Sequence, residues 1–410
     1  MMYLLRNVTC ILVETAPDSF IMMDCGEGSM GQMVRLFGVE RTKQILRQLR
    51  CVYISHMHAD HHLGLISVIQ LRERAVAEAG GGAADKLYVV STDRLIPFLI
   101  YYHDKFESLL SGCKIVKAEW LILYSEMDAD TWEHNHDKKL QRLFPDQLAP
   151  MLERLGCSEF YVSRAIHCPH AFCVAFRTRA GYKIAYSGDT RPCLGFREVA
   201  TWGGPPDLLI HEATMEHFMM YDAIIKKHST FTEAINEGKV MNAGFTMLTH
   251  FSQRYAKMPM LTEIEGHQNV GISFDMMQVN RSTLNLIPSI YPALEKFLED
   301  YKLELQDRAD QYKQKHSGLD LPTPEENFEE RQKTEKGVRK EDDTQMSPLE
   351  RKKRKAEELA KKHEEKHQWY NNMKLRKTLE MQQESSNSQG KQQSSLDNID
   401  TIKADMKKLS

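Results

Sequence analysis

A cluster of metal-ligating residue types follows directly after a short apolar segment of the chain. Residues 51–55 (CVYIS) are apolar and partly β-branched, which predicts a buried strand. The sequence then reads His56-Met57-His58-Ala59-Asp60-His61-His62-Leu63-Gly64. Where a chain turns out of a strand, alternate side chains can converge on one point, so the first two histidines are candidates for one metal ion and Asp60 and His61 for a second. Imidazole and carboxylate groups without a thiolate suit zinc, with manganese or iron as alternatives.

The alternative interpretation is a group of surface histidines, or of core histidines whose ring nitrogens bond to the backbone. An isolated His-x-His pair fits that interpretation equally well. Here four ligand-type residues fall within six positions at a strand exit (His56, His58, Asp60 and His61). That density favours a metal site.

Apolar segments alternate with helical segments over the first 300 residues. We predict a hairpin from residues 8–14 and 20–24 around a turn at 16–19, and helices from residue 30 onward, at 41–50 and at 65–79. Further strands are predicted at residues 87–91, 182–187, 207–210 and 245–249, and the last three run into Asp189, His211-Glu212 and His250. Polar residues at several strand ends indicate a layered α/β domain with its site on one rim.

Five further motifs narrow the assignment. They read Asp24-Cys25-Gly26-Glu27-Gly28, Ile166-His167-Cys168-Pro169-His170-Ala171-Phe172, Ser187-Gly188-Asp189-Thr190, His211-Glu212-Ala213-Thr214 with His228-Ser229-Thr230, and His250-Phe251-Ser252-Gln253-Arg254-Tyr255. With the histidine cluster, they resemble the motifs of the tRNase Z family of metallo-β-lactamase hydrolases, in particular the carboxy-terminal catalytic half of the long form. The resemblance covers residues 6 to about 260. It implies an α/β fold, the metallo-β-lactamase αβ/βα sandwich.

The resemblance also implies a centre of two zinc ions. The implied ligands are His56, His58 and His167 for one ion, Asp60, His61 and His250 for the other, and Asp189 as the bridge. His167 is preferred over His170 because it is the first histidine of its motif. We expect His62 to point away from the centre. Four histidines without a partner at ligand spacing are expected to have surface or core roles: His103, His134, His136 and His217.

The activity implied by the resemblance is zinc-dependent removal of the 3′ trailer from precursor tRNA, leaving a 3′-hydroxyl on the tRNA. Two zinc ions lower the pKa of a bridging water from ~15.7 to roughly 7, which makes hydroxide available at neutral pH. Asp60 would orient that hydroxide, and His228, held by Glu212, would protonate the leaving ribose oxygen. An ordinary buried ion pair is the alternative for Glu212 and His228. The resemblance places four residues in the substrate channel, although ordinary surface positions remain an alternative: Arg6, Asn7, Arg254 and Tyr255.

Two departures from the family pattern leave other functions open. The family begins with a strand and a Gly-Thr-Gly turn, and only Arg6-Asn7 of the following element is present, so we expect the first strand to be missing. Only 21 residues separate His167 from Asp189, too few for the arm with which short-form enzymes clamp tRNA. The alternatives are a phosphodiesterase or hydrolase acting on small substrates, a truncated product with impaired tRNA binding, and a non-catalytic RNA- or protein-binding relative.

Charge divides the chain into a body and a tail. Asp, Glu, Lys and Arg make up 65 of the first 300 residues but 46 of the last 110. We therefore predict a catalytic domain at 1–300 that is truncated at its amino-terminal end, a polar linker at 301–348, a charged helix at 349–383 and a low-complexity disordered tail at 384–410. The basic block at 351–355 is a candidate nuclear signal or RNA contact, or else one face of a solvated helix.

Composition limits the remaining possibilities. The net charge of −3 neither supports nor excludes an RNA partner. The eight cysteines include no CxxC pair, which favours a reducing compartment without disulfides. We find no apolar run of the ~18–20 residues that a membrane span requires, and no signal peptide. The family implies the nucleus or the mitochondrion, with the cytosol not excluded, and leaves monomer or homodimer open.

Overall fold

The structure is a computed structural model, and it describes residues 8–81, 85–123, 145–251, 268–297 and 307–314. The chain divides into two compact units, residues 1–335 and 336–410, and every described residue belongs to the first. The predicted charged helix at 349–383 and the predicted tail at 384–410 lie outside the described residues. The expected absence of a first strand also stays a prediction, because residues 1–7 are outside the described part.

A five-stranded sheet forms the amino-terminal half of the body. Its strand order is β1-β2-β3-β4-β5, comprising β1 (Ile11–Ala16), β2 (Ser19–Met23), β3 (Leu49–Ile54), β4 (Leu87–Ser91) and β5 (Cys113–Lys117). Strands β1 and β2 are the predicted hairpin and pair antiparallel, whereas β2 through β5 are parallel. The parallel arrangement places the carboxyl ends of β3, β4 and β5 at one rim.

A six-stranded sheet forms the carboxy-terminal half. Its order is β11-β10-β9-β8-β7-β6, comprising β6 (Cys157–Arg164), β7 (Phe172–Thr178), β8 (Lys183–Tyr186), β9 (Leu208–Glu212), β10 (Phe245–Thr249) and β11 (Val270–Ile272). Strands β6, β7 and β8 pair antiparallel, and β8 through β11 are parallel. The segments predicted at 182–187, 207–210 and 245–249 are therefore three neighbouring strands.

Alternation along each strand builds the layers, because successive side chains point to opposite faces of a sheet. In β2, Met23 joins the core between the two sheets, which also contains Phe160 and Tyr186 of the second sheet. Its neighbour Met22 faces outward and packs with Leu46 under the helices. Full burial of side chains of this size stabilises the fold by about 1.5–3 kcal/mol each.

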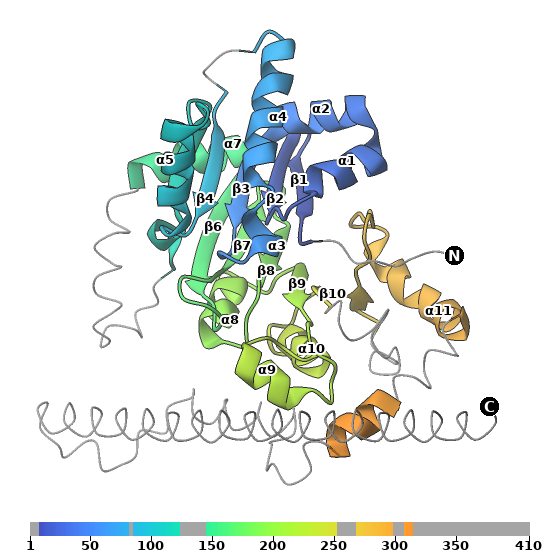
Figure 1. The fold of residues 1–410 in the computed structure, drawn as a ribbon. Helices are drawn as coiled ribbons and strands as arrows, with labels where there is room; N and C mark the ends of the chain where they lie inside the picture. The colour runs from blue at the N-terminus through green and yellow to red at the C-terminus, as the bar shows by residue number, and fades with distance from the viewer. Residues whose placement is uncertain (1–7, 82–84, 124–144, 252–267, 298–306, 315–410) are drawn as a thin grey trace, which may run out of the picture. The chain divides into compact units, whose positions relative to one another are not determined.

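Helices cover the outer faces of both sheets and complete the αβ/βα sandwich (Figure 1). The first sheet is covered by α1 (Ser29–Phe37), α2 (Val39–Gln48), α4 (Leu65–Glu78) and α5 (Leu95–Lys105). Helix α8 (Leu194–Thr201) packs on the outer face of the second sheet. The remaining helical elements are α3 (Ala59–His62), η1 (Ala118–Leu121), α7 (Pro145–Leu155), α9 (Met220–Lys226), α10 (Phe231–Val240), η4 (Leu284–Ile290) and α11 (Tyr291–Phe297). The predicted fold class is confirmed.

One segment of the predicted linker packs on the body. Residues 307–314 are helical, and the ring of Tyr312 lies edge-on to Phe218 at 5.8 Å between centroids. The Tyr312 hydroxyl accepts a hydrogen bond of 3.3 Å from the backbone N–H of Asp222 in α9. The linker at 301–348 stays a prediction, and within it this segment is helical and brings an aromatic side chain into apolar contact with the body. The other residues of the predicted linker lie outside the described part.

Two expectations from composition are consistent with the described residues. All eight cysteines are free thiols. None of the helices that the structure describes combines the length and the apolar character needed to cross a bilayer.

Candidate metal centre

Both sheets deliver ligand-type side chains to one rim of the sandwich. The histidine cluster follows the carboxyl end of β3, and Asp189 follows β8. Glu212 ends β9, and His250 comes directly after β10. Because the carboxyl ends of parallel strands share an edge, residues distant in sequence meet there.

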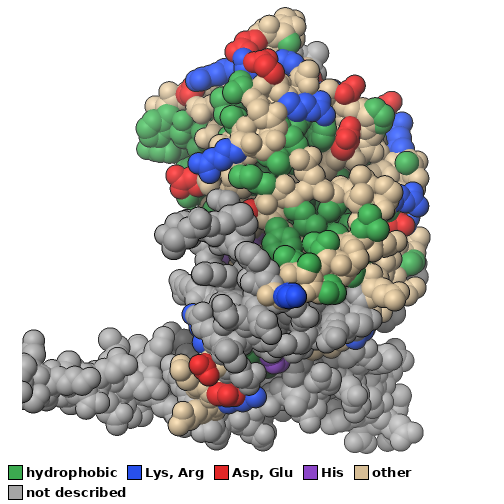
Figure 2. Space-filling view, turned by 90° about the vertical axis from the view of Figure 1, so that its right-hand side faces the viewer, with side chains coloured by type: hydrophobic (Ala, Val, Ile, Leu, Met, Phe, Trp, Pro, Cys, Tyr) green, Lys and Arg blue, Asp and Glu red, His purple; other side chains and the backbone are tan. Residues whose placement is uncertain are grey.

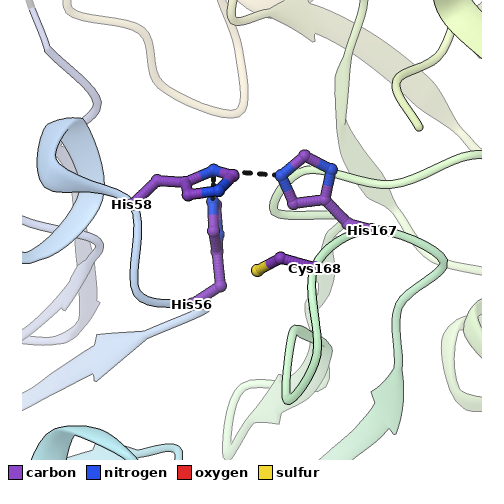
Figure 3. A group of neighbouring side chains, drawn as sticks. All are labelled: His56, His58, His167 and Cys168. Carbon is purple, nitrogen blue, oxygen red and sulfur yellow. Dashed lines mark hydrogen bonds between the residues drawn. The ribbon is translucent and has the colours of Figure 1, made fainter. Parts of the chain in front are cut away.

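The first group of side chains contains three imidazoles and one carboxylate. The Nε2 atom of His56 lies 2.9 Å from Nδ1 of His58, which lies 3.1 Å from Nε2 of His167. Asp189 Oδ2 lies 3.6 Å from His56 Nε2 and 3.8 Å from His167 Nε2. Figure 3 shows the three rings pointing toward one another, with Cys168 beside them.

The second group shares Asp189 with the first. His61 Nε2 lies 3.1 Å from His250 Nε2, and Asp60 Oδ2 lies 3.7 and 3.5 Å from these two nitrogens. Asp189 Oδ2 is 3.4 Å from His61 Nε2, and Asp189 Oδ1 is 3.4 Å from His250 Nε2. Asp189 therefore offers one oxygen to both groups and a second oxygen to His250.

The carboxylate–imidazole separations of 3.4–3.8 Å fit metal ligands better than hydrogen bonds, whereas the imidazole–imidazole distances of 2.9–3.1 Å also fit hydrogen bonds. Zinc bonds of about 2.0–2.2 Å in tetrahedral geometry separate two ligand atoms by roughly 3.3–3.6 Å. Asp189 is 2% exposed, and its buried Oδ1 has no hydrogen-bond partner among the described residues. Because an unpaired buried carboxylate oxygen is costly, a cation between the groups satisfies it. The donor set therefore fits two zinc ions that share this carboxylate.

Hydrogen bonds fix the orientation of three imidazole rings. Each bond is made by the ring nitrogen that faces away from the centre. Nδ1 of His56 contacts Ser55 Oγ at 3.0 Å, and Nδ1 of His167 lies 2.9 Å from the backbone carbonyl oxygen of Lys227. Nδ1 of His250 contacts the hydroxyl of Thr214 at 2.8 Å. Contacts of this kind fix ring orientation and raise the basicity of a ligating nitrogen.

Asp24 fixes the orientation of the His61 ring in the same way, from a more deeply buried position. Its carboxylate is fully buried and lies 2.8 Å from His61 Nδ1. It also accepts hydrogen bonds from the N–H and hydroxyl of Ser55 and from the hydroxyl of Tyr186, each at 2.7 Å. The sequence marks Asp24 only as part of a motif, because these partners become neighbours only in the fold.

Glycines allow the Asp24 loop and the histidine loop to interlock. A side chain at Gly64 would place its Cβ 2.2 Å from the carbonyl oxygen of Gly26, and one at Gly26 would lie 2.3 Å from the carbonyl oxygen of Asp60. The Gly64 N–H donates to Cys25 O at 2.9 Å, and the Cys25 N–H donates to His61 O at 2.7 Å. Only a residue without a side chain permits this backbone contact.

Glu212 and His228 form the predicted pair beside the centre. His228 Nδ1 lies 2.9 Å from Glu212 Oε1, which also accepts the Thr190 N–H at 2.8 Å. Burial lowers the pKa of His228, but the Glu212 charge and hydrogen bond outweigh burial and raise that pKa to about 9. Burial likewise opposes ionisation of Glu212, yet the charge of His228 keeps the Glu212 pKa below its usual value. The charge of Glu212 thus favours the protonated form of the His228 imidazole.

Sequence reasoning did not assign a role to Thr214 or Cys168. The Thr214 hydroxyl hydrogen bonds to Glu212 and lies 3.2 Å from His228 Nδ1 and 2.8 Å from His250 Nδ1, so it links the pair to the centre. Cys168 lies with His56, His58 and His167 in a group able to hold a metal ion. The sequence did contain a signal for each residue: Cys168 is next to the predicted ligand His167, and Thr214 lies within a motif.

The other histidines have local roles where they are described. His62 Nδ1 bonds to the backbone carbonyl oxygen of His58 at 2.8 Å, and His103 Nδ1 accepts the Leu109 N–H at 2.8 Å. His217 lies edge-on to Phe218 at 5.3 Å between centroids. His170 lies outside the two groups and faces Asp93 and Glu119. Six residues singled out from the sequence lie outside the described part: His134, His136, Arg6, Asn7, Arg254 and Tyr255.

A cavity of about 1120 Å³ opens from the centre. Its polar end contains Asp60, His228 and His250, and apolar side chains such as Met33 and Phe274 line much of the rest. Figure 2 views the side on which α1, α2 and α11 lie in Figure 1, and hydrophobic side chains gather near its middle. An apolar wall beside a charged centre suits a ligand with both planar and anionic parts.

Comparison with known proteins places these features in a family. No family model matches the chain. Ribonuclease Z, mitochondrial, of Drosophila melanogaster is 40% identical over 309 residues, which are 74% of this chain and 37% of that protein. Zinc phosphodiesterase ELAC protein 2 of Macaca fascicularis is 37% identical over 290 residues, which are 71% of this chain and 33% of that protein.

A solved structure agrees with these relatives. The crystal structure of a long form RNase Z from yeast matches with a TM-score of 0.58 and 33% sequence identity, over 68% of this chain and 39% of that one. The chain thus spans less than two fifths of the curated relatives named above.

Proposed function

The chain belongs to the tRNase Z family, and we propose that it is an endoribonuclease that removes the 3′ trailer from precursor tRNA and leaves a 3′-hydroxyl on the tRNA. The observation that carries this proposal is the shared carboxylate of Asp189 between two ligand groups, with the Glu212–His228 pair beside it. The printed names of the relatives, ribonuclease Z and zinc phosphodiesterase, support the reaction class and the metal.

We assign the residues of the two groups as ligands of two zinc ions. The first ion takes His56, His58 and His167, the second takes Asp60, His61 and His250, and Asp189 bridges them. When bound, two such ions activate a water molecule and neutralise charge on a phosphodiester. The spacings of 2.9 to 3.8 Å within the groups and the unpaired Asp189 Oδ1 support the assignment.

We assign to Asp60 the role of positioning the attacking water. Its side chain is 49% exposed, so the carboxylate is accessible from solvent at the mouth of the centre. A hydrogen bond from His250 lowers the pKa of Asp60, so the group remains an acceptor at neutral pH. A carboxylate that accepts a proton of the attacking water orients its lone pair toward the phosphorus atom.

We assign to His228 the role of protonating the leaving oxygen. Glu212 holds its Nδ1, so the other nitrogen, Nε2, is the one left to donate a proton. His228 borders the cavity that opens from the centre. Cleavage that leaves a 3′-hydroxyl on the tRNA releases the ribose 3′ oxygen, and proton donation to that oxygen avoids an alkoxide leaving group.

A second candidate is a phosphodiesterase or hydrolase that acts on small substrates with the same residues. One observation favours it. The residues between His167 and Asp189 are largely occupied by β7 and β8, which leaves no room for a tRNA-clamping arm there. Against the non-catalytic alternative, every predicted ligand lies in one of the two groups.

We propose that precursor tRNA is the partner of this chain and that the chain is located in mitochondria. The printed name of the Drosophila relative places that protein in mitochondria. A nuclear location is also part of the proposal and rests on the basic block at residues 351–355.

Cleavage of a 3′-extended precursor tRNA tests the proposal. The full chain is assayed with added zinc and with chelator, beside bis(p-nitrophenyl) phosphate as a small phosphodiester. We expect a cut after the discriminator base that is lost on chelation and in His56→Ala, and retained in His103→Gln, a histidine outside both ligand groups. Hydrolysis of the small ester alone would favour the second candidate. If the zinc-loaded protein hydrolyses neither substrate, both candidate functions are contradicted.

A further inference from the structure

A second cluster of ligand-type side chains lies apart from the two groups of the centre. Asp93 follows β4, Glu119 lies in η1 directly after β5, and His170 lies in the loop between β6 and β7. His170 Nδ1 is 3.4 Å from Asp93 Oδ1 and 3.6 Å from Glu119 Oε1. Three separate segments, from both sheets, therefore bring one imidazole and two carboxylates together.

The separations in this cluster differ from those of hydrogen-bonded pairs in the same protein. His61 lies 2.8 Å from Asp24, and His228 lies 2.9 Å from Glu212. The imidazole–carboxylate pairs within the two ligand groups are wider, at 3.4 Å for His61 and Asp189. The values of 3.4 and 3.6 Å at His170 thus match the spacing around a cation and exceed that of a good hydrogen bond.

Each member of the cluster has a buried polar atom without a hydrogen-bond partner among the described residues, although His170 Nδ1 lies within ion-pair distance of both carboxylates. Glu119 is 6% exposed, and its Oε2 makes no hydrogen bond among the described residues. The same holds for Asp93 Oδ1 and for His170 Nδ1. Leaving such atoms unpaired costs about 1–3 kcal/mol each, and more for charged groups. A metal ion bound between the three side chains would give each of these atoms a partner.

The charges of the cluster also call for a cation. Burial raises the pKa of Glu119 and the nearby charge of Asp93 adds to that rise, while hydrogen bonds from backbone N–H groups and from His170 oppose it. Arg94 is the adjacent cation, but its Nε is 4.0 Å from Asp93 Oδ1 and its side chain is 68% exposed. Solvent screens a contact of that kind, so it compensates the charge of Asp93 poorly.

We propose that Asp93, Glu119 and His170 bind a third divalent transition-metal ion, zinc or manganese. One imidazole nitrogen and two carboxylate oxygens are a donor set that both metals accept, with water completing the coordination. The ion joins the rim of the first sheet to the loop that also carries His167, three residues before His170. Its role is to hold that loop in place, and the site is independent of the proposed reaction.

Metal content of the purified full chain tests the proposal. The protein is saturated with zinc, dialysed, and assayed by inductively coupled plasma mass spectrometry. We expect three zinc ions per wild-type chain and two in Glu119→Gln and in His170→Asn. Glu73→Gln is the matched control, because Glu73 is another partly buried carboxyl with a raised pKa but without an imidazole partner, and it should retain three.

Two results would overturn the proposal. The first is two or fewer ions in the zinc-saturated wild type, and the second is an unchanged count in both folded variants. Anomalous diffraction at the zinc edge on wild-type crystals keeps the test decisive if the variants fail to fold. A peak bounded by Asp93, Glu119 and His170 supports the site, and a map with peaks only at the two-ion centre contradicts it.

Discussion

At the scale of single residues, unusual backbone conformations gather around the chemistry. Asp24, His170, Lys227 and His250 have φ angles of 54°, 60°, 57° and 59°. A residue other than glycine in this left-handed region costs roughly 1–3 kcal/mol when the surroundings enforce it. Two of the four belong to the ligand groups or hold a ligand, Lys227 precedes the proposed acid, and His170 belongs to the proposed third site. Strain is thus tolerated where side-chain direction matters.

The protonation state of His228 predicts a pH dependence. The proposed acid works in its protonated form, and its pKa is raised to about 9. Cleavage should therefore fall as pH rises through that range, and positive charge from bound metal moves the fall to lower pH. Glu212→Gln removes the carboxylate that raises the pKa. We expect this variant to lose activity by about 10²–10⁴-fold at neutral pH and to shift the alkaline limb further down.

The pH–rate profile of kcat/KM on precursor tRNA measures this shift. Glu73→Gln serves as a carboxylate control outside the centre and should keep the wild-type profile. An alkaline limb at the same pH in Glu212→Gln and wild type would remove His228 from the role of acid.

Asp24 predicts an effect on metal affinity. Asp24→Asn replaces an acceptor of hydrogen bonds from Ser55, Tyr186 and His61 with a group that also donates. The orientation of His61 then loses its support, and we expect zinc affinity to fall by about 10–100-fold. Titration against a chromophoric chelator measures this. Asp207→Asn changes a carboxylate that accepts the Lys183 backbone N–H far from the centre, and it should leave the affinity unchanged.

At the scale of elements, the strands that end in chemistry were predictable and the contacts among them were not. An apolar run that ends in a polar residue predicted a strand at residues 245–249. The structure has strand β10 at these residues. The link from Thr214 to His250 spans 36 positions and depends on β9 pairing with β10. A local sequence pattern carries no information on which strands pair, so the sequence did not predict a role for Thr214.

Helix α10 begins with a capping box that also supports His228. Thr230 accepts a hydrogen bond from the Glu233 N–H, and Glu233 accepts one from the Thr230 N–H. Arg191 pairs with Glu233 and donates to the His228 carbonyl oxygen at 2.7 Å. Thr230→Ala should lower the free energy of unfolding by about 1 kcal/mol and reduce activity. Chemical denaturation measures the first effect, and Thr230→Ser, which keeps the hydroxyl, should restore both.

At the scale of the whole molecule, the sequence predicted a layered α/β body but not the way its halves meet. The core between the sheets combines Tyr53 of β3 with Phe160 of β6, more than a hundred positions apart. Composition indicated a linker from residue 301, yet Tyr312 packs against Phe218 because one aromatic ring outweighs its polar neighbours. Average composition describes a segment and does not identify the residue that anchors it.

The two sheets also meet at the metal centre, which predicts that metal stabilises the entire body. The histidine cluster extends from the first sheet, whereas Asp189 and His250 extend from the second. An ion bound between them is absent from the unfolded chain, so it stabilises the fold by about 2.7 kcal/mol at a free concentration of 100 Kd. For a body of this size that corresponds to a rise of roughly 4 °C in Tm for one ion.

Thermal unfolding of zinc-loaded and chelator-treated protein tests this linkage. We expect chelation to lower Tm by that amount in wild type and in His103→Gln. Asp189→Ala should have a low Tm that responds little to zinc, because it removes the carboxylate shared by both groups. Equal Tm values for wild type with and without metal would mean that the apolar core alone holds the sheets together. The ligand geometry argues otherwise, since Asp189 of the second sheet lies 3.4 Å from His61 of the first and keeps a buried oxygen without a hydrogen-bond partner among the described residues.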